Sequence, residues 1–187
     1  MTDAQRFSRI VSLACHDLRT PLATVYGFSR TLERGGSLDE RSARFVTMIS
    51  QASEQMTSLL DELGAAARIE GGRFEAGLVE ADTIALATSD DERIATSGTG
   101  ETVETEPVAL SRSLQALAVA AVRFGPVERV TWLVDGRSLA LTPVLEAAAP
   151  VVLGDEIRDL GALVARLVIE QLGGSLALEG ETLGVQL

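Results

Sequence analysis

The chain has 187 residues, enough for one domain or two small ones, and its 46% hydrophobic and 23% charged residues are typical of a folded protein. Its 27 acidic and 16 basic residues give a net charge of −11, which argues against nucleic-acid binding because a phosphate backbone attracts basic surfaces. The single cysteine excludes an internal disulfide and a cysteine-based metal cluster, and the single histidine excludes a multi-histidine zinc site. The absence of lysine excludes a P-loop.

Targeting and membrane segments are not expected. Residues 1–9 are polar and lack the apolar stretch of a signal peptide. The longest apolar run, residues 117–122, has about six residues, whereas a bilayer span needs roughly 18. The sequence therefore predicts a soluble, cytoplasmic protein.

Two long helices are predicted first. Apolar residues recur in steps of three and four from residue 3 to about residue 34, and the pattern stops at the glycine pair 35–36. The members of this apolar stripe are Phe7, Ile10, Val11, Ala14, Leu18, Leu22 and Val25. Ser37 or Asp39 can cap a second helix that runs to about Ile69. A hairpin of two helices leaves apolar surface uncovered, so we expect a second copy to complete a four-helix bundle; the alternative is cover by the C-terminal domain.

The single histidine, His16, lies on the wrong face of the first helix for a core residue. At 100° per residue it points about 170° away from the centre of the apolar stripe, so we expect it to face solvent. Arg9, Ser12, Thr20 and Ala23 share its face. These neighbours leave room for a partner to approach the imidazole.

Residues next to His16 in sequence also distinguish this part of the first helix. Asp17 points sideways, where its carboxylate can hold or polarise the imidazole ring. Pro21 lies inside the helix and frees the carbonyl of Asp17, which is expected to bend the helix just past His16. Cys15 is interpreted as a small residue that fills space next to the helix seam.

The distribution of charge divides the chain in two. Residues 1–70 hold eight arginines and nine acidic residues, whereas residues 71–187 hold eight arginines and 18 acidic residues. The break falls at Gly71-Gly72, directly after the second helical pattern, which predicts domains over residues 1–72 and 73–187.

The second domain is predicted to alternate strands and helices. The strands are expected at 74–79, 93–96, 102–106, 130–134, 139–142, 175–179 and 183–186, and the helices at 82–88, 108–124 and 156–172. Asp135-Gly136 is the expected turn of a central hairpin. This order predicts an α+β sandwich, with a sheet covered on one face by helices.

The residues around His16 also carry a family resemblance. His-Asp-Leu-Arg-Thr-Pro-Leu at residues 16–22 is similar to the H-box of two-component sensor histidine kinases, and residues 59–73 resemble that family's helix end and linker. The resemblance spans roughly residues 5–75. It implies a dimerising hairpin in which His16 accepts a phosphoryl group, Asp17 assists, and Thr20 orients water for removing phosphate from a partner. The chemistry fits, since a neutral imidazole nitrogen is a competent nucleophile.

Three neighbours of His16 are candidate contacts to a phosphate or a partner. Arg19 is interpreted either as facing phosphate or an acidic partner pocket, or as a solvated arginine. Arg9 and Ala23 are predicted partner contacts because they share the face of His16.

Residues 73–187 resemble, in order and spacing, the ATP-binding catalytic domain of the same kinases, the GHKL type. The family's N-box holds magnesium and nucleotide phosphates with two asparagines one turn apart. Here Ala116 and Ala120 occupy those positions, and Arg123 replaces the usual lysine. Methyl groups cannot ligate a hard cation, which needs oxygen donors. The N-box therefore predicts that this chain binds no metal.

The other nucleotide boxes are also degenerate. Pro143, Leu145 and Ala147 stand where the family has its Asp-x-Gly-x-Gly run. Of the glycine-rich phosphate turn only Gly161 remains, and the nearby Asp159 would repel phosphate. We therefore expect no ATP binding and a degenerate, kinase-like domain.

Three functions stay open at this point. The first is a dimeric histidine phosphotransferase that moves phosphoryl groups between His16 and the aspartates of response-regulator receiver domains, with Mg²⁺ supplied by the receiver. The second is a phosphatase of a response regulator that uses Thr20. The third is a non-catalytic scaffold that binds a receiver or titrates a true histidine kinase.

Overall fold

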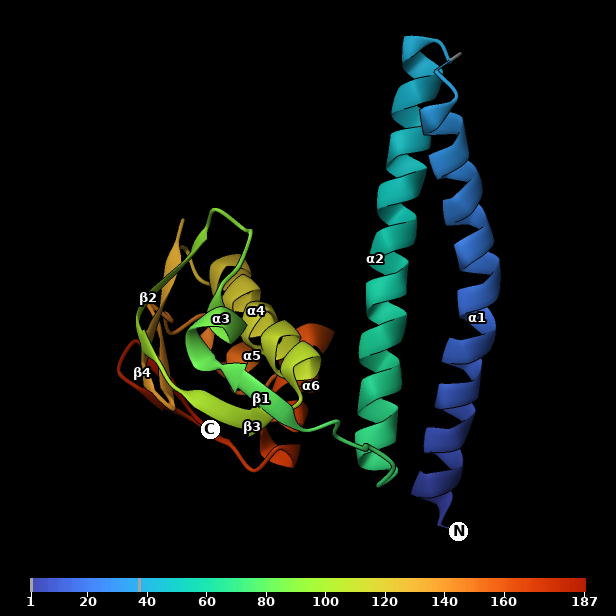
Figure 1. The fold of residues 1–187 in the computed structure, drawn as a ribbon. Coiled ribbons are helices and arrows are strands. Elements are labelled where there is room, and N and C mark those ends of the chain that lie inside the picture. The colour runs from blue at the N-terminus through green and yellow to red at the C-terminus, as the bar shows by residue number, and fades with distance from the viewer. Residues whose placement is uncertain (1, 37) are drawn as a thin grey trace. The chain divides into compact units, whose positions relative to one another are not determined.

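The computed structural model describes residues 2–36 and 38–187, which form two compact units. The first unit ends at Phe74 and is helical, and the second, Glu75–Leu187, combines helices with strands (Figure 1). The predicted fold class, a helical hairpin followed by a unit of helices and a sheet, is confirmed. Among the described residues, no helix combines the length and hydropathy that a bilayer crossing requires.

The first unit is a hairpin of two helices of similar length, α1 (Asp3–Arg34) and α2 (Glu40–Glu70), which lie side by side (Figure 1). Thr2 caps α1 in a reciprocal arrangement with Gln5, in which each side chain accepts the other residue's backbone N–H. Asp39 caps α2 and accepts the N–H of Ser42 at 2.9 Å. The alternative cap, Ser37, lies outside the described residues.

The seam between α1 and α2 is built largely from small side chains. On α1 the buried residues recur every seven positions. The buried residues of the two helices are Ser8, Cys15, Leu22 and Ser29 on α1, with Val46, Ser50, Ser53, Gly64 and Ala67 on α2. Hydroxyl groups bond across this seam: Ser50 donates to Ser29 at 2.9 Å, and Ser8 donates to the carbonyl of Ala67. Small residues let two helices approach closely, so the seam depends on close packing and a few polar contacts.

The large apolar side chains of the hairpin lie outside this seam. Of the predicted α1 stripe only Leu22 is buried, while Phe7 and Phe28 are 68% and 67% exposed. On α2 the exposed large apolar side chains are Phe45, Met48, Ile49, Met56, Leu59 and Leu63. The hairpin therefore presents an apolar face along both helices, and it is distinct from the seam that joins them.

The C-terminal end of α2 is closed by a Schellman motif. The N–H of Gly72 donates to the carbonyl of Ile69 at 2.9 Å, and the N–H of Arg73 donates to that of Arg68 at 2.7 Å. Gly72 adopts a φ of 62°, which a residue with a Cβ adopts only at a cost. The chain therefore turns sharply at Gly72, and the backbone of Arg73 is fixed at the helix end.

Gly71 provides a test of how closely the end of α2 packs against Ser8 on α1. A Cβ on Gly71 would lie 2.3 Å from the Ser8 hydroxyl and 3.0 Å from the Ala67 carbonyl oxygen. Gly71→Ala is expected to lower the free energy of unfolding by about 1–3 kcal/mol because the Ser8 contact must break. Gly27→Ala is the matched control: a Cβ there meets nothing within 4 Å, so alanine is expected to stabilise α1 by up to about 1 kcal/mol. Chemical denaturation of both variants would measure this contrast, and equal effects would contradict the packing.

The second unit contains a mixed five-stranded sheet in the order β2-β4-β5-β7-β6 and a separate antiparallel pair, β1-β3. In the five-stranded sheet, β2 pairs parallel with β4 and the other neighbours are antiparallel. The strands are β1 (Val79–Asp82), β2 (Ile94–Gly100), β3 (Thr102–Thr105), β4 (Val130–Gly136), β5 (Ser138–Thr142), β6 (Ser175–Glu179) and β7 (Thr182–Gln186). The helices are α3 (Thr83–Ala87), α4 (Pro107–Phe124), α5 (Ala149–Val152) and α6 (Leu160–Gln171).

Helices α4 and α6 cover one face of the sheet (Figure 1). Along β4, Val130, Trp132 and Val134 are buried while Leu133 between them is 47% exposed, which is the alternation of a sheet with one covered face. The largest side chains of this core are Trp132, Leu110, Leu114, Leu117, Leu139, Leu141, Ile169 and Leu183.

Three element predictions were wrong. The strand predicted at 74–79 begins only at Val79, because residues 74–78 pair with no other strand of the described chain. The helix predicted from residue 156 begins at Leu160, where the Asp159 side chain caps it. The central turn consists of Gly136 and Arg137, one residue later than predicted, since Asp135 still pairs with Ser138.

Candidate functional site

His16 projects from the middle of α1 into solvent, and its side chain is 76% exposed. Its Nδ1 lies 3.1 Å from Oδ1 of Asp17, whose side chain is 67% exposed. An ionised carboxylate can only accept a hydrogen bond, so this contact places the ring hydrogen on Nδ1. The lone pair is then left on Nε2, and the site offers an accessible nitrogen nucleophile.

The face around His16 is open, as the sequence predicts. Arg9, Thr20 and Ala23 are all exposed. In the part of the chain that the structure describes, no hydrogen bond uses the Thr20 hydroxyl; only the Thr20 carbonyl has a partner, accepting from Thr24 Oγ1 at 3.1 Å. This hydroxyl is therefore available to orient a water molecule or a partner group. Its role, like those of Arg9 and Ala23, stays a prediction.

Pro21 lies inside α1, directly after Thr20, and is exposed. Proline has no backbone N–H, so the carbonyl of Asp17 receives no i−4 hydrogen bond from it. The backbone of the residue that holds the His16 ring is therefore relieved of one helical constraint.

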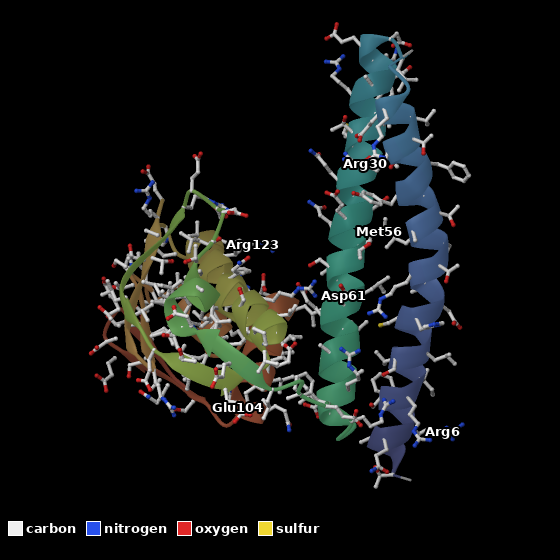
Figure 2. All side chains as sticks on the ribbon, viewed as in Figure 1. Arg6, Arg30, Met56, Asp61, Glu104 and Arg123 are labelled. Atoms are coloured by element: carbon white, nitrogen blue, oxygen red, sulfur yellow. The ribbon has the colours of Figure 1, made fainter. Side chains whose placement is uncertain are left out.

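Arg19 joins the two helices next to His16. Its Nη2 and Nε donate to Oδ1 of Asp61, at 2.8 Å and 3.2 Å. Asp61 lies on α2 (Figure 2). Both side chains remain more than a third exposed. A Cβ on Gly64 would lie 3.5 Å from Arg19 Nη2 and 3.9 Å from Cys15 Cβ, so the glycine leaves space for this ion pair. The structure thus gives Arg19 an interhelical partner, and its contact to phosphate stays a prediction.

Arg73 is a neighbour of this face that sequence reasoning missed. Its Nη2 donates to the hydroxyls of Ser8 and Ser12 on α1, at 3.0 Å and 3.1 Å. Ser12 lies four residues before His16 and therefore one turn below it on nearly the same face. The available signal was that Ser12 shares the His16 face while Gly71-Gly72 turns the chain back towards α1.

The positions that resemble a degenerate nucleotide site lie on and around α4 in the second unit. Ala120 is fully buried in the core and Ala116 is half-buried. Arg123, at the C-terminal end of α4, is exposed and donates to Asp159 Oδ2 at 3.3 Å (Figure 2). Its guanidinium also stacks 5.3 Å from the ring centroid of Phe124.

The start of α6 is occupied by the chain's own carboxylate. Asp159 Oδ1 accepts the N–H of Ala162 at 2.9 Å, and Gly161 lies within the first turn of the helix. A helix N-terminus attracts anions, and here an aspartate already fills that role.

The segment between β5 and α6 packs into the core. Pro143 is half-buried directly after β5, and Val144, Ala148, Val151 and Val152 are each no more than 1% exposed. Helix α5, formed by part of this segment, contacts both α4 and α6. Side chains thus fill the space between this segment and α4. Within residues 2–36 and 38–187, no cluster of three or more metal-ligating side chains occurs.

Comparison with known proteins shows which proteins the hairpin is similar to. Residues 8–72 match the His Kinase A (phospho-acceptor) domain. A probable sensor histidine kinase, TcrY of Mycobacterium tuberculosis, is 32% identical over 88 residues, which cover 46% of this chain and 18% of that protein. The sensor protein DivL of Caulobacter vibrioides is 32% identical over 75 residues, covering 40% of this chain and 10% of that protein. The matched regions therefore span less than a fifth of each relative.

Solved structures match the fold of both units. Full-length ShkA, crystallised in complex with AMPPNP, aligns over 95% of this chain and 44% of its own length, with a TM-score of 0.67 and 20% identity. The histidine kinase AdeS of Acinetobacter baumannii aligns over 92% of this chain and 96% of its own, with a TM-score of 0.56 and 17% identity.

Proposed function

Because residues 8–72 match the His Kinase A (phospho-acceptor) domain and the chain has the two-part fold of the histidine kinases, we propose that it is a dimeric histidine phosphotransferase without autokinase activity. Residues 1–72 serve as the dimerisation and phosphoacceptor domain, and residues 73–187 as a degenerate catalytic domain. The observation that carries the proposal is the contrast between the two units. An exposed His16 is paired with Asp17 in the first unit, whereas in the second unit the buried Ala120 stands where the resemblance to a nucleotide site calls for an oxygen ligand.

The transfer step follows from the geometry of His16. The Nε2 lone pair attacks the phosphorus of a receiver's aspartyl phosphate, and the new P–N bond forms as the P–O bond to the aspartate breaks. The aspartate leaves as a carboxylate. The proton on Nδ1 stays against Asp17, whose charge balances the phosphoimidazolium. The same steps in reverse pass the phosphoryl group to a second receiver. Mg²⁺ enters with the receiver, whose oxygen ligands bind it.

Three features support the absence of autokinase activity. Ala120 lies in the core and offers no ligand to Mg²⁺. Asp159 occupies the α6 N-terminus, where it would repel a phosphate. The segment that follows β5 fills the core with Val151 and Val152. A kinase site would need an open cleft with anion-binding groups at these places.

The exposed apolar face of the hairpin fits a second copy of this chain. The face runs along both helices and includes Phe28 and Met48, while His16 points to the opposite side of α1. Pairing through it gives a four-helix bundle that leaves both His16 side chains accessible. This is the geometry that a receiver needs, since it must reach the imidazole from outside the bundle.

The homodimer predicts an effect of charge on the apolar face. Phe28→Glu is expected to convert a dimer into a monomer because a carboxylate would be buried without a partner. Ala23→Glu, which places the same charge on the exposed His16 face, is expected to stay dimeric. Multi-angle light scattering measures both. A monomeric wild-type chain, or two variants of equal mass, would contradict this interface.

The transfer function is tested with receiver domains charged with labelled phosphate and mixed with the wild-type chain. Acid-labile label on this chain that a second, uncharged receiver then removes supports phosphotransfer. Label that leaves the receiver as free phosphate, without first becoming attached to this chain, supports a phosphatase instead. The Thr20 hydroxyl, which has no hydrogen bond within the described residues, makes this the second candidate function. In that case Thr20→Ala is expected to suppress the release. A stable complex with a receiver or a true histidine kinase, without any transfer or release of label, would support a scaffold function.

A further inference from the structure

The guanidinium of Arg73 is held next to the His16 face by backbone geometry. The Schellman motif fixes the Arg73 backbone through its 2.7 Å bond to the Arg68 carbonyl. From there the side chain folds back onto α1, passing Gly71, where a Cβ would lie 3.2 Å from Arg73 Nε. Glycine at this position therefore gives the arginine room to reach α1.

The partners of this guanidinium are neutral. Nη2 donates to the hydroxyls of Ser8 and Ser12, and within the described residues no carboxylate forms an ion pair with Arg73. Most other arginines whose side chains have a partner are paired with a carboxylate instead. Those paired with a carboxylate are Arg19, Arg30, Arg93, Arg123, Arg137, Arg158 and Arg166. Arg73 is therefore a preplaced cation whose charge is not compensated by a carboxylate.

Ser12 places this cation within reach of His16. Residues four apart on a helix lie about 5–6 Å from each other at Cβ, so the bound guanidinium lies about one turn from the imidazole. The charged groups around His16 are Asp17, Arg9 and the Arg19–Asp61 pair, and of these Arg19 is already held by its carboxylate. A phosphoryl group on Nε2 would bring a dianion to this surface beside an arginine that has only hydroxyl partners.

We propose that Arg73 binds the phosphoryl group that His16 carries. This inference rests on the proposed function and extends it to a residue outside the H-box. The hydroxyls hold the guanidinium loosely in the unmodified protein. When His16 is phosphorylated, the guanidinium donates to the phosphoryl oxygens in charge-assisted hydrogen bonds, which are stronger than its bonds to serine. No bond beyond the P–N bond forms or breaks in this contact.

Arginine suits this role better than lysine. Its planar fork can donate two parallel bonds to one phosphoryl group, and it remains charged throughout the working pH range. The contact stabilises phosphohistidine relative to the receiver's aspartyl phosphate. It also favours ionisation of the phosphoryl group, since a nearby cation stabilises the dianion.

The test uses the single histidine of the chain and needs no partner protein. Phosphoramidate, a small phosphoryl donor, phosphorylates His16 directly, and phosphorus-31 NMR follows the last ionisation of the phosphoryl group with pH. Arg73→Gln is expected to raise the pKa of this ionisation by about half a unit, the size of an exposed ion-pair contribution. Arg73→Lys is expected to give a smaller rise.

Two further variants separate binding from a structural effect. Arg44→Gln removes an exposed arginine about 30 Å farther along the hairpin, so the titration is expected to be unchanged. Ser12→Ala removes a hydroxyl that holds the guanidinium but keeps the cation, so the pKa is expected to stay the same or fall. An unchanged titration in Arg73→Gln, or equal rises in Arg73→Gln and Ser12→Ala, would overturn the proposal.

The titration tests the Arg73 contact independently of the transfer assay. If receivers exchange no phosphate with the wild-type chain but the titration shifts as expected, the phosphotransferase function fails and the Arg73 contact stands. If transfer proceeds and Arg73→Gln leaves the titration unchanged, the function stands and the Arg73 contact fails.

Discussion

His16→Gln is expected to abolish phosphoryl acceptance, with a loss of at least about 10³-fold, because the substitution removes the attacking nitrogen itself. No other imidazole can replace it, since the chain has one histidine. The side chain of His16 is 76% exposed and packs against nothing in the core, so the free energy of unfolding is expected to change by less than about 0.5 kcal/mol. The measurement is acid-labile label on the chain after mixing with a charged receiver.

The control for this variant is Arg44→Gln, which changes an exposed side chain far from the site and is expected to accept phosphate at the wild-type rate. Circular dichroism of both proteins checks that the hairpin remains helical. Acid-labile label that persists on His16→Gln would place the phosphoacceptor elsewhere and remove the basis of the proposed function.

Ala120→Asn is expected to destabilise the second unit by about 2–4 kcal/mol, because a larger and polar side chain must enter a fully packed core. Asparagine is the residue that the resemblance to the kinase ATP-binding domain leads us to expect at this position. Here the α4 face at Ala120 is closed by the core. Ala116→Asn, at a half-buried position one turn away, is expected to cost less than about 1 kcal/mol. Urea unfolding of the two variants measures the difference.

The double variant Ala116→Asn/Ala120→Asn extends this test to ligand binding. It is expected to show no thermal stabilisation by ATP with Mg²⁺, because Asp159 and the core-filling α5 segment remain in place. Clear stabilisation of the double variant, or of the wild-type chain, would show that the second unit keeps a usable nucleotide cleft.

Local signals in the sequence were strong enough to predict much of the fold. The long helices α1 and α2 could be predicted because apolar residues recur in steps of three and four along each of them, and Asp39 caps the second helix. The exposure of His16 followed from its angle to the apolar stripe. The start of α6 was missed because residues 156–159 continue a helical pattern. Only the hydrogen bond that the Ala162 N–H donates to the Asp159 carboxylate shows where the helix begins.

The features that could not be predicted depend on contacts between distant residues. The α1–α2 seam consists mainly of serine, alanine, glycine and cysteine, which produce no hydrophobic pattern in the sequence. The pattern of large apolar residues therefore predicted the apolar face of the hairpin and not the seam. Arg73 meets Ser8 across 65 positions of sequence, and only the turn at Gly72 makes this contact possible. Helix α5 is too short to show a period, and its burial depends on the helices that pack around it.

Cys15 gives the hairpin an internal reporter. It is adjacent to His16 in sequence, yet it is 1% exposed in the seam, while the imidazole beside it is open to solvent. As the only thiol of the chain, it can react with an alkylating reagent only when α1 separates from α2. The rate of its alkylation therefore measures the opening equilibrium of the seam. The same purified protein thus reports phosphoryl chemistry through one side chain and the integrity of its scaffold through the next.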